Sequence, residues 1–169
     1  MNYFELFEMP VSLQPDEKGV KQKFYELSRK YHPDFYTNAS EDEQAQVLEM
    51  SSSVNKAYKT FQNKDATIQY VLKEKELLAE EEKYELPPAF LMEMLELNEQ
   101  LMDAKMENDE VLIIAIHQQI KNIETEIYEP VKNIVEHYKE GVTTEEELLQ
   151  VKAYYYKKKY LTRILAGMR

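Results

Sequence analysis

The chain has 169 residues, no cysteine and a formal net charge of −11 at pH 7. Its length suits one domain or two small ones. The absence of cysteine excludes disulfides, thiolate metal ligands and thiol catalysis, and the acidic excess argues against general binding to a nucleic-acid backbone. Few glycines and prolines, among many Glu, Lys, Leu, Gln and Met residues, favour an all-α fold.

No stretch approaches the roughly 20 apolar residues of a membrane span. The first ten residues, MNYFELFEMP, lack the basic region and long apolar core of a secretory signal, so we expect a cytoplasmic protein with no membrane partner. Residues 1–75 carry ten Lys/Arg against twelve Asp/Glu, a net of −2, and residues 76–169 carry eleven against twenty, a net of −9. This asymmetry indicates two units with different partners, with ordinary surface solvation as the alternative.

The chain begins with two predicted helices separated by prolines. Residues 3–8 predict a short helix that ends before Pro10. Pro15 and Asp16 suit the first turn of a second helix, where a missing N–H costs nothing and the helix dipole favours acid. The residues expected to face the core are Tyr3, Phe4, Leu6, Phe7, Val20, Phe24, Leu27 and Tyr31.

Pro33 is expected to end the second helix, because proline displaces the residue before it from the α region. After a loop, Ser40 and Glu43 predict a capping box that starts a third helix. A further short helix is expected over residues 65–73. The core-facing residues of these helices are Val47, Met50, Val54, Ala57, Phe61, Ile68, Val71 and Leu72.

A charged segment that ends in two prolines divides the chain. We expect residues 76–88 to be a linker between a unit at 1–75 and one at 89–169, with helical propensity in the first half of the charged segment 73–88. The second unit contains three helical patterns with short connections, as in an antiparallel three-helix bundle. Its breaks are marked by Asn108-Asp109, a bend at Pro130, a stop at Gly141 and a capping box at Thr144-Glu147.

The sequence does not predict an enzyme. His32 and Asp34 are candidates for a catalytic pair, but no Ser, Thr or Lys is specifically placed beside them as a nucleophile. His117 and His137 lack the glutamate three residues earlier that a di-metal carboxylate bundle uses. We therefore expect no catalytic residue, no metal and no cofactor.

A docking surface for another protein explains the His32-Pro33-Asp34 tripeptide better than a catalytic pair does. The basic residues of the preceding helix lie mostly away from its apolar face and lead towards this loop. Such a surface would steer encounter with an acidic groove of a protein partner, and the loop would fix the register. A solvated helix face is the alternative. The basic residues are Lys18, Lys21, Lys23, Arg29 and Lys30.

Residues 1–75 resemble a J domain. The resemblance rests on a short helix, a basic helix, YHPD, a loop and VNKAYKTF on the second hairpin helix. It implies binding to a DnaK-like chaperone ATPase and stimulation of its ATP hydrolysis, with His32, Pro33 and Asp34 in contact with the ATPase. Asp34 would accept from an arginine of the partner. Many J domains have lysine after the tripeptide, where this chain has Phe35.

Nearly the whole chain is similar to the HscB family, the J-type co-chaperones of iron–sulfur cluster assembly. This similarity rests on MNYFELFEMP at the start and AFLMEMLELNEQL at 89–101. It implies that the C-terminal bundle binds a cluster scaffold protein and that the chain works with HscA or another DnaK-like chaperone. The segment NKDATIQYVL lacks an arginine expected early in the last J-domain helix, and the cysteine-rich metal site of some eukaryotic relatives is absent.

The residue pattern of the helix at 89–102 indicates a partner-binding face independently of the family resemblance. Beside its core stripe of Phe90, Met94, Leu97 and Leu101, it carries a second apolar stripe that extends toward Met102. Excess apolar surface rimmed by acid is typical of an interface, although burial of the helix on two sides is the alternative. The scaffold-binding pattern of the family maps onto Leu91, Met92, Leu95, Glu96 and Glu99.

The family also implies an aromatic residue of the third helix at the scaffold surface. In AYYYKKKY (153–160), periodicity turns Tyr155 inward, so Tyr156 is the candidate. These features predict a monomeric, two-unit co-chaperone that delivers an iron–sulfur scaffold to an HscA-type chaperone. A J protein with a different client is the main alternative. A structural adaptor whose tripeptide only ends a helix, and an acidic-bundle metal enzyme, are the others.

Overall fold

The computed structural model describes residues 1–167, and every regular element in this range is a helix. The chain divides into two compact units, one of Met1–Lys75 with Tyr138–Val142 and the other of Glu76–His137 with the segment from Thr143 onward. The predicted all-α fold class is therefore confirmed. Within the described residues, no helix is long and apolar enough to cross a membrane.

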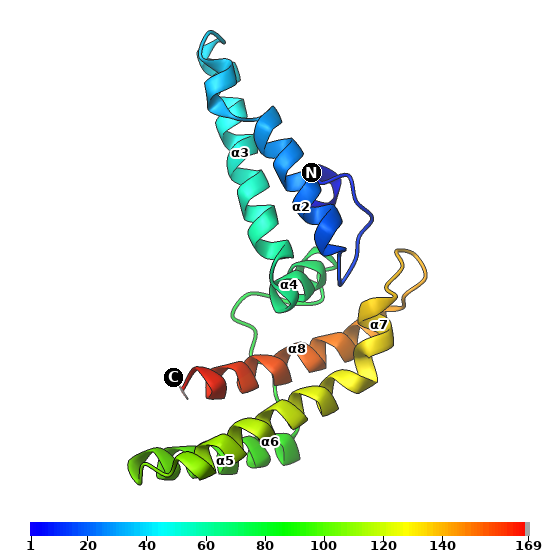
Figure 1. Cartoon of the computed structure of the whole chain (residues 1–169). Helices are drawn as coiled ribbons and strands as arrows, with labels where there is room; N and C mark the ends of the chain where they lie inside the picture. Colours follow the sequence, from blue (N-terminus) through cyan, green and yellow to red (C-terminus); the bar gives the residue numbers. More distant parts are fainter. Residues whose placement is uncertain (168–169) are drawn as a thin grey trace. The chain divides into compact units, whose positions relative to one another are not determined.

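The first unit is built on a hairpin of two long helices that lie side by side (Figure 1). They are α2 (Glu17–Lys30) and α3 (Glu41–Phe61), joined at a tip that contains the 3-10 helix η1 (Pro33–Tyr36). The short helices α1 (Tyr3–Leu6) and α4 (Lys64–Glu74) complete the unit. All four predicted helices of this unit are present.

Side-chain caps fix where the hairpin helices begin. Asp16 Oδ2 accepts a hydrogen bond from the backbone N–H of Gly19 at 3.0 Å, so Asp16 is the N-cap of α2 and not a first-turn residue. Ser40 Oγ accepts from the N–H of Glu43 at 3.2 Å, which is one half of the expected capping box. Both caps satisfy N–H groups that have no partner within the helix.

Aromatic rings hold the N-terminal residues in the core of the first unit. The ring of Tyr3 stacks on that of Tyr70 at 4.5 Å, and the N–H of Tyr3 donates to the Tyr70 hydroxyl at 2.9 Å. The Phe4 and Phe61 ring centroids are 5.0 Å apart. Because such pairs stabilise beyond the area they bury, these rings fix the N-terminal segment, whose Phe4, Leu6 and Phe7 are buried in the core that supports the hairpin.

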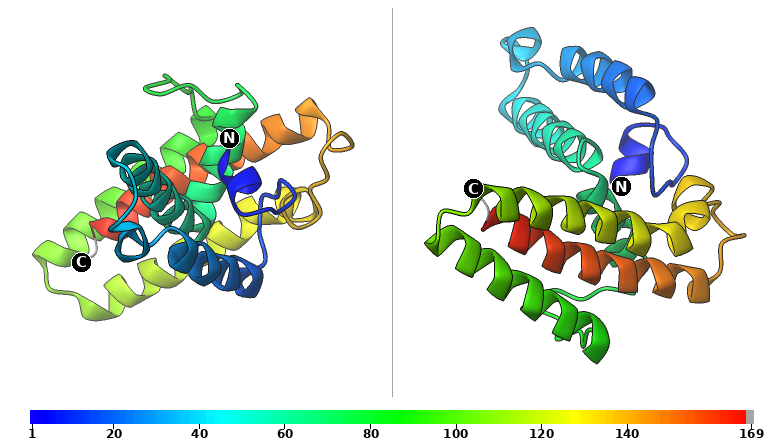
Figure 2. Two further views of the ribbon diagram at one scale, coloured as in Figure 1. Left: turned by 90° about the horizontal axis from the view of Figure 1, so that it is seen from above. Right: turned by 60° about the horizontal axis from the view of Figure 1, so that its bottom comes forward.

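The second unit is an antiparallel three-helix bundle of α5 (Pro88–Met106), α6 (Glu110–Tyr128) and α8 (Glu145–Ala166), seen in both views of Figure 2. Between α6 and α8 the chain forms η2 (Glu129–Val131) and α7 (Lys132–Glu136). The buried side chains at the centre of the bundle are Phe90, Met94, Leu97, Leu101, Ala104, Ile116, Ile120, Ile123, Leu161 and Ile164.

The main difference from the predicted bundle lies at Pro130. Proline there interrupts the α-helix instead of bending it, because its ring removes an N–H donor and clashes with the preceding turn. α7 then ends at Glu136, so Gly141 lies in the following loop, with φ of +79°, and is not the helix stop. Thr144 and Glu147 form the complete predicted capping box, with reciprocal bonds of 3.1 and 3.0 Å.

We predict that Ile120→Ala lowers the free energy of unfolding of the bundle by about 2–5 kcal/mol, because it leaves a cavity among fully buried side chains. Denaturant unfolding followed by helical circular dichroism measures the change. The neighbouring exposed Gln119→Ala is the control and should shift stability by less than about 0.5 kcal/mol. Equal effects of the two substitutions would contradict this assignment of the core.

Candidate partner-binding sites

The His-Pro-Asp tripeptide lies at the exposed tip of the α2–α3 hairpin. α2 ends at Lys30, and His32 is the N-cap of η1 with extended backbone (φ −73°, ψ 126°), as the following proline requires. The predicted helix stop is thus confirmed. The side chains of His32, Pro33 and Asp34 are all exposed, so the tip presents them to solvent.

The hydrogen bonding of the tip sets what His32 offers to a partner. Its Nδ1 accepts from the backbone N–H of Asp34 at 3.2 Å, which places the proton of a neutral imidazole on Nε2. Nδ1 is also 3.6 Å from Asp34 Oδ2, but an acceptor nitrogen cannot donate to that carboxylate. The tip therefore presents an Nε2–H donor and a carboxylate acceptor side by side.

Two other side chains hold the tip in this shape. The Tyr36 hydroxyl donates to the carbonyl of Lys30 at 2.8 Å and so satisfies a free carbonyl at the end of α2. From α3, Gln44 Nε2 donates to the carbonyl of Tyr36 at 3.0 Å and to that of Thr37 at 3.2 Å. The tripeptide is consequently supported from both hairpin helices.

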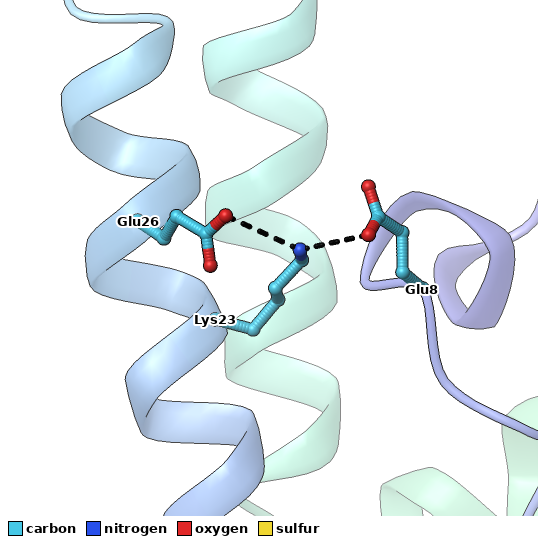
Figure 3. Close-up of polar contacts among 3 residues, drawn as sticks. All are labelled: Glu8, Lys23 and Glu26. Carbon is cyan, nitrogen blue, oxygen red and sulfur yellow. Dashed lines mark hydrogen bonds and ion pairs between the residues drawn. The ribbon is translucent and has the colours of Figure 1, made fainter.

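The predicted basic residues of α2 fall into two groups. Lys23 is 17% exposed, and its Nζ lies 3.0 Å from Glu8 and 3.5 Å from Glu26, as Figure 3 shows. The hydrogen bond with Glu8 raises the pKa of Lys23, and this lysine is neutralised within the unit. The other four side chains are exposed: Lys18, Lys21, Arg29 and Lys30.

Two aromatic residues lie beside the tripeptide: Phe35, which the sequence showed in place of the usual lysine, and Tyr25, which was not predicted as part of this surface. Tyr25 and Phe35 are 53% and 74% exposed. Tyr25 lies one helical turn before Arg29, off the core stripe, and this position was the signal available in the sequence. The two rings line a concave surface together with Ser28, Arg29, His32 and Asp34.

The second apolar stripe of α5 is exposed in the structure. Met92 and Leu95 are 59% and 49% exposed, and Leu91 is half-buried. Glu96 and Glu99 are exposed beside them. Exposed large apolar residues also continue along α5 to Met102. The structure therefore brings together the five predicted residues of this helix on one accessible, acid-rimmed face.

Residues 82–88, here called the strap, lie against α8. Glu82 accepts from Lys152 Nζ at 2.6 Å and from the Tyr156 hydroxyl at 2.8 Å. The ring of Tyr84 stacks on that of Tyr156 at 4.3 Å and 5°. In the first half of the charged segment 73–88, only Lys73 and Glu74 are helical, as the end of α4, and residues 75–81 are not helical.

The strap changes the interpretation of Tyr156. Two hydrogen bonds lower the pKa of Glu82, the larger effect coming from Lys152 and the smaller from Tyr156. The pKa of Tyr156 is raised, mainly by burial and secondly by its hydrogen bond to the Glu82 carboxylate. The tyrosine hydroxyl thus stays protonated and donates to the strap. Tyr155 is buried, as its periodicity predicts. Tyr156 is partly exposed and lines a pocket with Leu91, which places it beside the α5 stripe.

Tyr160 also lines this pocket and was not in the predicted set. It lies one helical turn beyond Tyr156 and packs against the bundle core while remaining partly exposed. Because the hydroxyl of Tyr156 is already bonded to Glu82, Tyr160 is a second aromatic candidate for the same surface. The four-residue spacing of the two tyrosines was the sequence signal.

These surfaces are suited to binding other proteins: one polar and basic at a helical tip, the other apolar on a bundle. Two such surfaces on an all-helical chain fit the class of proteins that bind other proteins. Within residues 1–167, no group of three or more His, Cys, Asp or Glu side chains is arranged to hold a metal ion.

Comparison with known proteins identifies the family. Residues 86–169 match the family model described as the HSCB C-terminal oligomerisation domain. The curated co-chaperone protein HscB homolog of Photobacterium profundum is 33% identical over 122 residues, which cover 71% of each chain. The chain therefore belongs to the HscB family of co-chaperones, as the sequence resemblance predicted.

Two solved structures share the fold of this chain. The chaperone HscB from Vibrio cholerae superposes with a TM-score of 0.76 at 22% identity, covering 99% of this chain and 95% of that one. The human co-chaperone protein HscB gives a TM-score of 0.82 at 26% identity, with 99% and 80% covered. The curated relative and the human structure are both named as co-chaperones.

We predict that Glu82→Gln loosens the strap, because the neutral amide loses two charge-assisted hydrogen bonds. Limited digestion with a lysine-specific protease should cut after Lys83 about tenfold faster than in the wild type. The exposed Glu85→Gln is the matched control and should leave the rate unchanged. An unchanged rate for Glu82→Gln would show that Glu82 does not hold the strap.

Proposed function

We propose that this protein is a J-domain co-chaperone that brings an iron–sulfur cluster scaffold protein to a DnaK-like chaperone of the HscA type and stimulates its ATP hydrolysis. In this proposal residues 1–75 are the J domain and residues 89–169 bind the scaffold. The observation that supports it most is the supported, solvent-facing His32-Pro33-Asp34 tip at the end of an exposed basic helix.

Each residue of the tip has a distinct role in docking to the chaperone. The Nε2–H of His32 donates to the partner, and the carboxylate of Asp34 accepts from a partner arginine. Pro33 fixes the backbone that holds these two groups side by side. The exposed cations of α2 steer the encounter with an acidic groove, with Lys23 contributing least because it is paired. These steering cations are Lys18, Lys21, Arg29 and Lys30.

Stimulation of hydrolysis requires more than binding. A ligand accelerates a reaction only when it binds the transition state, or the conformation that leads to it, more tightly than the resting state. The tip is suited to this task because Tyr36 and Gln44 brace its backbone, and the bond from the Asp34 N–H to His32 Nδ1 orients the imidazole. A preorganised tip loses little entropy on binding, so its interaction energy is available to shift the chaperone.

The apolar face of α5 is the proposed scaffold-binding site. Leu91, Met92 and Leu95 would be buried by the scaffold, and Glu96 and Glu99 would form the polar rim. Tyr156 borders the same face through the pocket that it shares with Leu91. We further propose that the protein acts as a cytoplasmic monomer and has no catalytic residue, metal or cofactor of its own, and no nucleic-acid or membrane partner.

His32→Gln should abolish at least nine-tenths of the stimulation of ATP hydrolysis by the cognate DnaK-like chaperone, because it alters the donor at the tip. Single-turnover ATP hydrolysis measures the effect. His137→Gln is the matched control, since it makes the same change at another exposed histidine. Full stimulation by His32→Gln, or none by the wild type, would contradict a role in chaperone binding and would mean that the tripeptide only ends α2.

Leu91→Ala combined with Met92→Ala should weaken binding to the scaffold protein by roughly 10- to 100-fold, the scale of lost hot-spot residues. Isothermal titration calorimetry with the full chain measures the affinity. Val111→Ala with Ile114→Ala is the control, because it removes exposed apolar surface from α6. Unchanged scaffold affinity in the α5 variant would refute this face, and absent scaffold binding by the wild type would favour a different client.

A further inference from the structure

The C-terminal half of α8 is a basic surface on an acidic unit. Residues 76–169 carry a net charge of −9, yet five of their eleven basic residues lie between positions 152 and 163. Lys152 is paired with Glu82. Lys159 and Arg163 are exposed and one helical turn apart, so they lie on the same side of the helix.

Lys159 and Arg163 border the pocket between the strap and α8. Its lining combines aromatic and aliphatic surface from Tyr84, Leu86, Leu91, Tyr156 and Tyr160. Lys159 Nζ also lies 5.9 Å from the centroid of the Tyr156 ring, within the range of a cation–π contact. The pocket thus has an apolar interior and a cationic edge.

The acidic groups of the pocket do not neutralise that edge. Glu82 is already bound by Lys152 and Tyr156. Glu85 is exposed, and Lys83 lies two positions before it on the strap. Counting Lys83, Lys159 and Arg163 against Glu85, the remaining lining charge is positive. A carboxylate on an apolar stem is the group that this combination fits, because lysine and arginine both bind carboxylates strongly when water is excluded.

We propose that this pocket receives an acidic side chain of the scaffold protein, the same partner whose apolar surface covers Leu91, Met92 and Leu95. The inference rests on the proposed function and adds the orientation of the partner. Leu91 lines the pocket, whereas Glu99 lies eight residues further along α5, about 12 Å away. The partner surface must therefore be acidic at one end and basic at the other. A reversed partner would bring like charges together at both ends, so charge sets the direction of docking.

The test is titration of the full chain with the cognate scaffold protein by calorimetry. Lys159→Gln with Arg163→Gln should weaken binding about 5- to 20-fold at low salt, and the loss should shrink as salt screens the contact. Lys121→Gln with Lys132→Gln removes two exposed charges elsewhere in the same unit and is the control, expected to stay within twofold. Circular dichroism verifies that both variants are folded.

Each outcome supports or overturns the inference. Equal weakening by the control pair would reveal a general charge effect and overturn it. Unchanged binding by the Lys159/Arg163 variant, while the Leu91/Met92 variant still binds weakly, would overturn it and leave the proposed function standing. No binding by the wild type would overturn both.

Substitution of each scaffold Asp and Glu by its amide then identifies the acidic side chain. A double-mutant cycle with the Lys159/Arg163 variant should show at least threefold coupling at one position. The absence of any coupled position would also overturn the proposal.

Discussion

Proline cannot continue an α-helix, and the exposure of the His32-Pro33-Asp34 tip depends on this constraint at Pro33. α2 must stop before it, which turns His32 into a cap and leaves its side chain and that of Asp34 outside the helix. Two side chains then hold the tip, since Tyr36 bonds to the free carbonyl of Lys30 at the end of α2 and Gln44 bonds to the carbonyl of Tyr36 in the turn that follows. A tripeptide in a longer, unsupported loop would sample many arrangements and lose entropy on docking.

The bundle is governed by a different constraint. Each helix of a three-helix bundle buries one stripe, and α5 buries its Met94 side in the core. A second apolar stripe on the same helix therefore has no place in the bundle, and Met92 and Leu95 remain exposed. Exposed apolar surface favours aggregation unless a partner covers it. The acidic rim and the basic edge of the neighbouring pocket restrict which partner fits.

The features predicted correctly from sequence are those that local rules decide. Pro33, the cap at Thr144 and the buried stripe of α5 follow from backbone sterics, hydrogen bonding and periodicity within a few residues. The break at Pro130 was predicted as a bend, because helix propensity does not determine whether a proline bends an α-helix or interrupts it. Exposure of the second α5 stripe was predicted because a helix in a small bundle buries one apolar stripe, and α5 carries two.

The missed features depend on contacts between residues far apart in the chain. Glu82 and Tyr156 are 74 positions apart, and Glu8 and Lys23 are 15 apart. No local pattern shows that the strap lies on α8 or that one of five lysines and arginines on α2 is already paired. Tyr25 and Tyr160 were missed for a related reason. Each lies one helical turn from a predicted site residue, but this spacing does not distinguish a tyrosine that lines a pocket from one that is merely solvated.

If the proposed function is right, one molecule must hold the scaffold and trigger the chaperone at the same time. The experiment that decides this mixes two full-length variants, one altered at His32 and one at Leu91 and Met92, and measures the scaffold captured by the ADP-bound chaperone. The mixture should capture no more scaffold than either variant alone, because neither molecule joins the two partners. Capture restored to the wild-type level would refute the proposed function.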